Sequence, residues 1–345
     1  MKTILITGGA GFIGSAFTKY IYEKYPEYKI IVLDALTYAG NIENLPVDIC
    51  KALDNERFEF WNGNILNGPL VNSLVARSEY VVHFAAESHV TRSIFDNKLF
   101  FETDVLGTQV IANAVCRYKD TVRRFIHIST SEVYGTAATS AMNEDHPLNP
   151  MSPYAAAKAG ADRLVYSYWS TYTIPAVIIR PFNNYGPRQH LEKVIPRFIT
   201  SVMLGEQLRV HGDGQSARDF VHTDDTCRAI DLALHADEKL VVGEVFNVGS
   251  GADRSILSLA QDITSLMCTD KKCYIHVGDR PGQVMRHTCD SSKIEDVLGW
   301  TPSVKWEDGL KDVIDWYNDN AEWWRKMLWM REIPIITAAG EKELH

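Results

Sequence analysis

Short apolar runs alternate with longer amphipathic stretches along the first half of the chain. We expect strands where the apolar runs fall, at residues 2–7, 28–33, 57–60, 80–85, 125–128 and 174–179. Helical patterns lie between them, up to residue 25 after a glycine-rich turn, at 70–76, at 105–118 and in a long segment after residue 153. This alternation predicts an α/β fold with a Rossmann-type, doubly wound parallel sheet.

The pattern changes near residue 181. Prolines, glycines and basic residues become frequent beyond it, and strands no longer alternate regularly with helices. We therefore expect a first domain over residues 1–180 and a smaller C-terminal α/β domain over residues 181–345, with some strands exchanged between the two. An apolar and aromatic stretch at 322–330 predicts a helix packed on the second domain or on a partner subunit.

A glycine-rich turn separates the first strand from the first helix. Gly8, Gly11 and Gly14 permit a tight turn, close approach of the backbone to a pyrophosphate, and close helix packing. The helix that follows offers amide N–H groups and the positive end of its dipole to phosphates. About 20 residues later, Asp34 can accept hydrogen bonds from both ribose hydroxyls and would repel a 2′-phosphate. The pattern predicts a domain that binds NAD rather than NADP.

Polar side chains follow the ends of two neighbouring strands. Glu87 and Ser88 come after one strand, and Thr130, Ser131 and Glu132 come after the next. The carboxyl ends of parallel strands meet at one edge of a sheet. We therefore expect both groups to face the same crevice.

A tyrosine and a lysine share one face of the helix predicted after residue 153. Tyr154 and Lys158 are spaced by one helical turn in a segment with few helix breakers. An ammonium group beside a phenol favours the phenolate and lowers the pKa of the phenol, which can make a tyrosine a general base. The candidate catalytic residues are therefore Thr130, Ser131, Glu132, Tyr154 and Lys158.

The overall composition excludes several classes of function. The 345 residues are 46% hydrophobic and 23% charged, which is typical of an ordinary globular protein. The net charge of −9 gives no electrostatic basis for binding nucleic acid or an anionic membrane. The first residues form neither a signal peptide nor a membrane span, so we expect a cytoplasmic protein. Its six cysteines lack the paired spacing of metal sites, and no metal is predicted.

The second half of the chain supplies charged residues that suit a phosphorylated ligand. Guanidinium groups match the geometry of phosphate oxygens, and ammonium groups supply compact positive charge. The candidates are Glu192, Lys193, Arg197, Arg209, Arg218, Arg280 and Arg286.

Taken together, these motifs resemble those of the extended short-chain dehydrogenases/reductases. Within that superfamily they are most similar to the nucleotide-sugar 4,6-dehydratases, the family typified by dTDP-glucose 4,6-dehydratase. The resemblance is carried by the glycine-rich turn, by residues 34–41, 83–90 and 129–135, by the tyrosine and lysine of the long helix, and by residues 183–187. The run Ala-Ala-Glu-Ser-His-Val at 85–90 and the pair Glu192–Lys193 point to dehydratases in particular.

The resemblance implies that an NDP-hexose becomes an NDP-4-keto-6-deoxyhexose, by oxidation at C4, loss of water across C5 and C6, and return of the hydride to C6 from recycled NAD. It implies that Thr130 binds the 4-hydroxyl, that Tyr154 is the base for that hydroxyl, and that Lys158 holds the nicotinamide ribose. Glu132 matches the family's base at C5. We expect NAD at Gly8, Gly11, Phe12, Ile13, Gly14, Asp34, Thr37, Asn64, Ile65, Ala85, Tyr154 and Lys158. We expect the nucleotide sugar at Glu87, Ser88, Thr130, Asn183, Asn184, Glu192, Lys193, Arg209, Arg218, Asn247 and Arg280.

Two positions depart from the family pattern. Members that act on dTDP-glucose carry an Asp that protonates the leaving C6 hydroxyl where this chain has Ser131. A serine hydroxyl is a far weaker acid, so either Glu132 also passes on the C5 proton, or another group or a water supplies one. Asn64 stands where the family commonly has an Asp that touches adenine, and it still permits hydrogen bonding.

Other functions stay open at this point. The Thr-Ser-Glu run also resembles the GDP-mannose 4,6-dehydratases and the UDP-glucuronate decarboxylases, although the Glu87-Ser88-His89 run argues against a decarboxylase. An NDP-sugar 4-epimerase would leave Glu132 idle, and a silent NAD-binding sensor or scaffold would not need a complete tyrosine–lysine pair. A homodimer, formed through the helices that carry Tyr154 and residues 105–118, is a family expectation. The nucleotide and the hexose are not fixed by the sequence.

Overall fold

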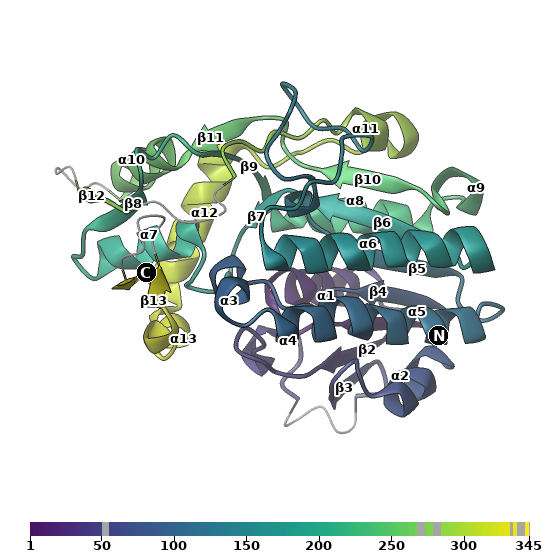
Figure 1. Ribbon diagram of the computed structural model, residues 1–345. Coiled ribbons are helices and arrows are strands. Elements are labelled where there is room, and N and C mark those ends of the chain that lie inside the picture. The colour runs from purple at the N-terminus through teal and green to yellow at the C-terminus, as the bar shows by residue number, and fades with distance from the viewer. Residues whose placement is uncertain (50–54, 268–272, 279–283, 332–333, 337–341, 345) are drawn as a thin grey trace.

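The first lobe is built on a seven-stranded, fully parallel sheet with helices on both faces (Figure 1). The computed structural model describes residues 1–49, 55–267, 273–278, 284–331, 334–336 and 342–344. In spatial order the strands are β10 (Val245–Val248), β6 (Ala176–Pro181), β5 (Arg124–Ile128), β4 (Tyr80–His83), β1 (Lys2–Thr7), β2 (Tyr28–Asp34) and β3 (Phe58–Asn62). The doubly wound α/β fold predicted from the sequence is confirmed.

Two helical layers bury the two faces of this sheet. Ile4 and Ile6 of β1 share one core with α1 (Phe12–Lys24) and α8 (Thr223–His235). Leu5, between them, points to the other core, which α2 (Gly68–Val75), α5 (Thr108–Arg117) and α6 (Pro153–Tyr172) cover. Burial on both faces explains why the strands are nearly continuous apolar runs rather than alternating ones.

The helix predicted at 105–118 differs from the observed one. The chain is helical without a break from α4 (Lys98–Phe100) through a π-helical turn (Phe101–Gly107) into α5. A Cβ at Gly107 would lie 2.4 Å from the Ile65 side chain, so glycine permits the close approach of this turn to the sheet edge. π-helical turns are rare and often lie at functional sites.

One strand of the first lobe comes from the second half of the chain. β10 pairs in parallel with β6 at the edge of the sheet, and α11 (Ser292–Leu298) and α9 (Glu238–Val241) lie near it (Figure 1). The chain therefore leaves the first lobe after β6 and returns to it. The division into residues 1–180 and 181–345 stays a prediction.

The second lobe is smaller and mixed. Its sheets are β11 (Asp253–Ser255), β9 (Ala217–His222) and β7 (Asn183–Tyr185), and β12 (Tyr274–Val277) with β8 (Leu208–His211). Its main helices are α7 (Val194–Met203), α10 (Ile256–Leu266), α12 (Trp306–Asp319) and α13 (Ala321–Arg325). The remaining elements are α3 (Val90–Phe95), β13 (Pro334–Ile336), β14 (Lys342–Leu344) and the 3-10 helices Ile42–Asn44, Ser131–Tyr134 and Leu328–Met330.

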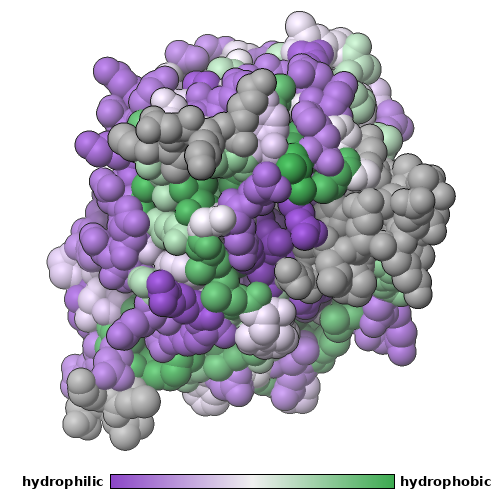
Figure 2. All heavy atoms as spheres, turned by 90° about the vertical axis from the view of Figure 1, so that its left-hand side faces the viewer, coloured by the Kyte–Doolittle hydropathy of each residue, from purple (hydrophilic) through white to green (hydrophobic). Residues whose placement is uncertain are grey.

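The aromatic C-terminal stretch packs on this second lobe. Trp323 and Trp324 are buried in one core with residues of α7 and α12. The outer face of the lobe carries hydrophilic and hydrophobic side chains intermingled (Figure 2). The stretch at 322–330 therefore contributes to the core of its own chain.

Candidate active site

The glycine-rich turn forms a cradle at the start of α1. Gly8 has a positive φ of 70°, and a Cβ there would lie 2.6 Å from the backbone nitrogen of Ala85. A Cβ on Gly14 would lie 2.1 Å from the carbonyl oxygen of Gly8. No side chain caps the helix at Gly11, so amide N–H groups of the first turn, which begins at Phe12 and Ile13, can donate to a ligand. This arrangement fits a diphosphate.

Asp34 lies beside the cradle, at the end of β2. Its carboxylate is buried and accepts hydrogen bonds from the backbone N–H of Ala10 at 2.9 Å and of Leu36 at 2.8 Å. Burial raises the pKa of Asp34, and the two amides lower it. A carboxylate has about four acceptor positions, so capacity remains for two ribose hydroxyls.

The other residues predicted to bind the cofactor lie along the same edge of the sheet. Thr37 is exposed in the loop after β2, and Ala85 follows β4 and contacts the cradle. Asn64 follows β3 and accepts a hydrogen bond from the Leu66 amide at 2.8 Å, while Ile65 is buried. The structure thus brings the predicted cofactor residues together at the carboxyl ends of neighbouring strands.

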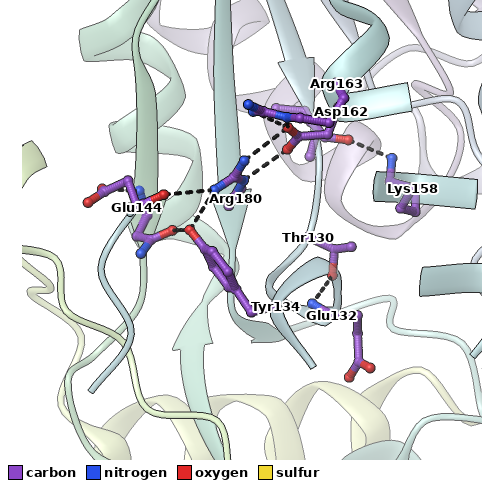
Figure 3. Close-up of polar contacts among 10 residues, drawn as sticks. Thr130, Glu132, Tyr134, Glu144, Lys158, Asp162, Arg163 and Arg180 are labelled. Atoms are coloured by element: carbon purple, nitrogen blue, oxygen red, sulfur yellow. Dashed lines mark hydrogen bonds and ion pairs between the residues drawn. The ribbon is translucent and has the colours of Figure 1, made fainter. Parts of the chain in front are cut away.

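The predicted catalytic residues meet between the end of β5 and the start of α6. Thr130 caps the 3-10 helix Ser131–Tyr134, because its Oγ1 accepts a hydrogen bond from the Glu132 amide at 3.2 Å. Tyr154 is buried at the start of α6, close enough to Thr130 for the threonine hydroxyl to lower the pKa of the phenol. One turn along α6, Lys158 is buried and donates to the carbonyl oxygen of Ile128 at 2.7 Å (Figure 3).

The lowered tyrosine pKa expected from the sequence is not found in the free protein. Burial raises the pKa of Tyr154, and the charges of Asp104 and Glu132 raise it further, while the hydrogen bond from Thr130 lowers it. Burial also lowers the pKa of Lys158, against the influence of Asp104. Burial and the two carboxylates therefore set the direction of the shift, and the pKa of Tyr154 is raised rather than lowered.

Asp104 is a buried acid that sequence reasoning missed. It lies in the π-helical turn, and its Oδ1 accepts a hydrogen bond from the Glu87 amide at 2.8 Å. Burial raises its pKa to about 7. It influences both Tyr154 and Lys158, so it belongs to the same electrostatic unit.

A buried ion pair fixes α6 to the sheet. Arg180 of β6 donates two hydrogen bonds of 2.9 Å to Asp162, which lies one turn beyond Lys158 (Figure 3). Arg180 also donates to the hydroxyl of Tyr134 at 2.8 Å. Glu132 points away from this network in Figure 3, toward the second lobe. The network therefore fixes α6 to the sheet without using the carboxylate of Glu132 as a partner.

Asn247 belongs to that network rather than to an open surface. It is fully buried; its side-chain oxygen accepts from Tyr134 at 2.7 Å, and its side-chain nitrogen donates to the Met142 carbonyl at 3.0 Å. Both side-chain atoms are thus used internally, and a contact of Asn247 with the nucleotide stays a prediction. Asn184 is similar, because its side chain bonds to Thr226 and to the Phe182 carbonyl.

The predicted substrate residues Glu192, Lys193 and Ser88 lie together. Lys193 Nζ donates to the Ser88 carbonyl at 2.9 Å and lies 3.3 Å from Glu192 Oε1. Tyr38, which sequence reasoning did not single out, donates to Glu192 at 2.9 Å. Glu87 is buried close by, with a pKa raised by burial and lowered by Arg92. Segments far apart in the chain therefore meet at this point.

Other charged candidates are dispersed. Arg218 is buried on β9 and faces Glu132, whereas Arg209 is exposed on β8 and Asn183 lies at the start of β7. Arg280 lies outside the described residues. Two earlier candidates are used internally: Arg197 donates to the Arg331 carbonyl, and Arg286 donates to the loop carbonyls of Ser140 and Thr139.

A model of the GDP-mannose 4,6 dehydratase family matches residues 5–313. The chain is also 41% identical over 328 residues to dTDP-glucose 4,6-dehydratase of Streptomyces niveus, covering 94% of this chain and 95% of that protein. The chain belongs to the GDP-mannose 4,6-dehydratase family. Its resemblance to the extended short-chain dehydrogenases/reductases is confirmed.

Solved structures extend this comparison. DesIV, a dTDP-glucose 4,6-dehydratase from Streptomyces venezuelae crystallised with NAD, matches with a TM-score of 0.88 at 40% identity, covering 94% of this chain and 99% of that one. UDP-glucose 4-epimerase of Thermotoga maritima matches with a TM-score of 0.84 at 30% identity, covering 92% and 99%. Dehydratases and epimerases therefore share this fold, and the site must distinguish them.

Within the described residues, no cluster of three or more His, Cys, Asp or Glu side chains could hold a metal ion. Nor is any helix there long and apolar enough to cross a membrane.

Proposed function

We infer that the protein is an NAD-dependent nucleotide-sugar 4,6-dehydratase that converts an NDP-hexose to an NDP-4-keto-6-deoxyhexose. The observation that carries this inference is the partly exposed carboxylate of Glu132, which stands next to Thr130 at the end of β5 and points away from the internal ion pair (Figure 3). A base beside the reacting carbons is what an elimination needs. The dehydratase relatives, at about 40% identity, support it.

The residues of this chain suit successive steps on the sugar. NAD, when bound at the glycine cradle and Asp34, supplies a hydride acceptor for C4 and a hydride donor for C6. Tyr154, oriented by Thr130, takes the proton of the 4-hydroxyl, and Lys158 is placed to hold the nicotinamide ribose. Once C4 is a ketone, the hydrogen on C5 becomes acidic, and Glu132 removes it as the C6 oxygen leaves.

A 4-epimerase is the second candidate, because an epimerase shares the fold. Epimerisation at C4 needs the tyrosine, the lysine and a hydroxyl, but no base at C5. Glu132 remains partly accessible to the crevice and is directed away from the internal ion pair (Figure 3). This favours the dehydratase.

The test is incubation of the purified protein, without added cofactor, with dTDP-, UDP-, GDP- and CDP-hexoses in deuterated water, followed by mass spectrometry. We expect loss of one water and gain of one deuterium at C5 from one nucleotide. Glu132→Gln should abolish that product while its isosteric amide preserves the fold, and Tyr154→Phe should abolish all reaction. Loss of carbon dioxide from a uronic acid, or only inversion at C4, would replace the dehydratase by a decarboxylase or an epimerase.

We also propose a homodimer that forms through the helices on the α5 and α6 face. Large apolar side chains are exposed there, namely Phe95, Leu99, Phe101, Leu106, Tyr166 and Tyr172. Such an apolar area on one face is typical of a protein interface. Leu106→Asp should yield a monomer in sedimentation, whereas Leu266→Asp, at an exposed position of α10 in the second lobe, should not. We also propose a cytoplasmic location.

A further inference from the structure

The elimination needs a proton donor for the C6 oxygen, and Ser131 stands where the dehydratases that act on dTDP-glucose carry an acid. Hydroxide is a poor leaving group, so the oxygen must receive a proton as its bond to C6 breaks. Ser131 lies between Thr130 and Glu132 on the 3-10 helix, but an isolated serine hydroxyl is too weak an acid to give up a proton unaided. A second group must replace the proton that the serine donates.

His287 occupies the position from which such a proton could come. Its Nδ1 lies 3.4 Å from the Oγ of Ser131 and 3.9 Å from Oε1 of Glu132. Its Nε2 lies 2.8 Å from the carbonyl oxygen of Gly135. A carbonyl oxygen only accepts hydrogen bonds, so Nε2 carries a hydrogen and Nδ1 is the atom that gains or loses a proton. The contact with Ser131 is long, as contacts in unliganded sites often are.

The surroundings of His287 make its protonated form a good donor. The imidazole is fully buried, packs edge-to-face on the Phe182 ring, and faces Glu132 on the 3-10 helix, Arg218 on β9 and His146. Burial lowers the pKa of His287, and Arg218 and His146 lower it further, while Glu132 raises it. A lowered pKa makes the imidazolium a stronger acid than a histidine in water.

We propose that His287 supplies, through the Ser131 hydroxyl, the proton that the departing C6 oxygen takes up; this rests on the dehydratase function proposed above. His287 is a positioning residue, because it acts on the substrate only through Ser131. Glu132 handles the proton at C5, and Ser131 with His287 handles the oxygen at C6. Two consecutive residues of the 3-10 helix thus perform the two proton transfers of the elimination.

The step balances in atoms and charge. Glu132 takes the proton of C5, the electron pair forms the C5–C6 double bond, and the C6–O bond breaks. The leaving oxygen takes the Ser131 hydroxyl proton and becomes water, while Ser131 takes the proton of His287 Nδ1. His287 ends as a neutral imidazole that keeps its hydrogen bond to Gly135. Oxidation at C4 releases one proton from the 4-hydroxyl, and the departing water takes up one proton from His287. The two cancel, so His287 can be reprotonated from solvent with no net change over the cycle.

The experiment uses two substrates that differ only at C6, the natural NDP-hexose and its 6-deoxy-6-fluoro analogue. Fluoride leaves without protonation, so only the hydroxyl substrate needs the proposed route. His287→Gln keeps a side-chain amide for the Gly135 carbonyl but cannot deliver a proton. We expect it to slow dehydration by about 100-fold or more and to leave fluoride elimination within a few-fold of the unaltered protein. The control His276→Gln, on an exposed strand residue, should change neither rate.

Two further measurements separate the proton route from a structural role. Ser131→Asp in the His287→Gln background places an acid at the serine position, so it should restore dehydration. In the unaltered protein, kcat should fall as pH rises through the pKa of His287, because the protonated form is the donor, and His287→Gln should lack this limb. Equal losses on both substrates, or no loss on either, would overturn the proposal. Absence of turnover by the unaltered protein would overturn the dehydratase function itself.

Discussion

The buried ion pair between Arg180 and Asp162 offers the sharpest test of how the catalytic helix is held. Asp162→Asn keeps the shape of the side chain and removes its charge. Arg180 then loses a charged partner in a site where both residues are almost completely shielded from water. The guanidinium would keep only uncharged acceptors, namely the amide oxygen at position 162, the Tyr134 hydroxyl and the Glu144 carbonyl.

The expected loss can be worked from these contacts. Two hydrogen bonds of 2.9 Å join Arg180 to Asp162, and a hydrogen bond to a charged group contributes about 1.5–3 kcal/mol. Breaking one side of a buried pair costs about 3–5 kcal/mol. We therefore expect Asp162→Asn to lower the free energy of unfolding by about 3–5 kcal/mol. Arg163→Met removes a half-exposed partner of the same carboxylate and should cost less than about 1 kcal/mol.

The assay is urea unfolding, followed in parallel by tryptophan fluorescence and circular dichroism so that a single transition can be verified. Arg180→Met and the double variant complete a thermodynamic cycle. Because the double variant leaves no unpaired buried charge, its loss should be at least about 2 kcal/mol smaller than the sum of the single losses. Strict additivity, or a loss for Asp162→Asn no larger than for Arg163→Met, would refute the reasoning.

Three other predictions follow from the cradle and from buried titratable groups. Gly14→Ala forces a Cβ to 2.1 Å from the Gly8 carbonyl oxygen and should weaken NAD binding at least about 10-fold by calorimetry, whereas Gly68→Ala, with open space around it, should not. Burial lowers the pKa of His83 to about 3, below its unfolded value, so the protein loses stability as pH falls. Between about pH 7 and 5 the free energy of unfolding should fall by about 2 kcal/mol. His83→Gln should abolish this pH-dependent loss when unfolding is measured across the same pH range. Burial raises the pKa of Asp104 to about 7, above its unfolded value, so the stability that its protonated form contributes is lost as pH rises toward 7. In the same titration, Asp104→Asn should therefore become more stable relative to the unaltered protein as pH rises. If either variant leaves the pH dependence of the free energy of unfolding unchanged, the corresponding assignment is wrong.

The layers of the fold could be predicted because local chemistry repeats along the chain. Apolar strands end in polar residues at the same edge each time, and the glycine spacing before α1 has a steric reason that the structure reproduces in the contact of Gly14 with Gly8. The π-helical turn could not be predicted, since i to i+5 hydrogen bonding has no residue pattern of its own. Only the close approach of Gly107 to Ile65 reveals why the turn is placed there.

Site residues that are neighbours in sequence could be predicted, whereas residues that come from distant parts of the chain could not. Thr130 and Glu132 belong to one short segment, but His287 lies 156 positions beyond Ser131 and has no motif around it. Long-range pairs of this kind depend on the path of the chain through the second lobe. The sequence also could not show that both polar side-chain atoms of Asn247 are hydrogen-bonded inside the protein, or that burial raises the pKa of Tyr154.

The return of β10 to the first sheet has a consequence for how the protein is made. During synthesis, the strand partner of β6 at residues 245–248 emerges from the ribosome more than sixty residues after β6 is complete. Until then, one edge of the parallel sheet presents unpaired backbone groups, which invite pairing with another nascent chain. The first part of the second lobe, from β7 to β9, therefore has to be synthesised before the first lobe is closed, whereas α10, α12 and α13 follow β10 in the chain. A chain stopped between the two lobes would be exposed to aggregation, and the second lobe cannot be exchanged between relatives as a single continuous segment.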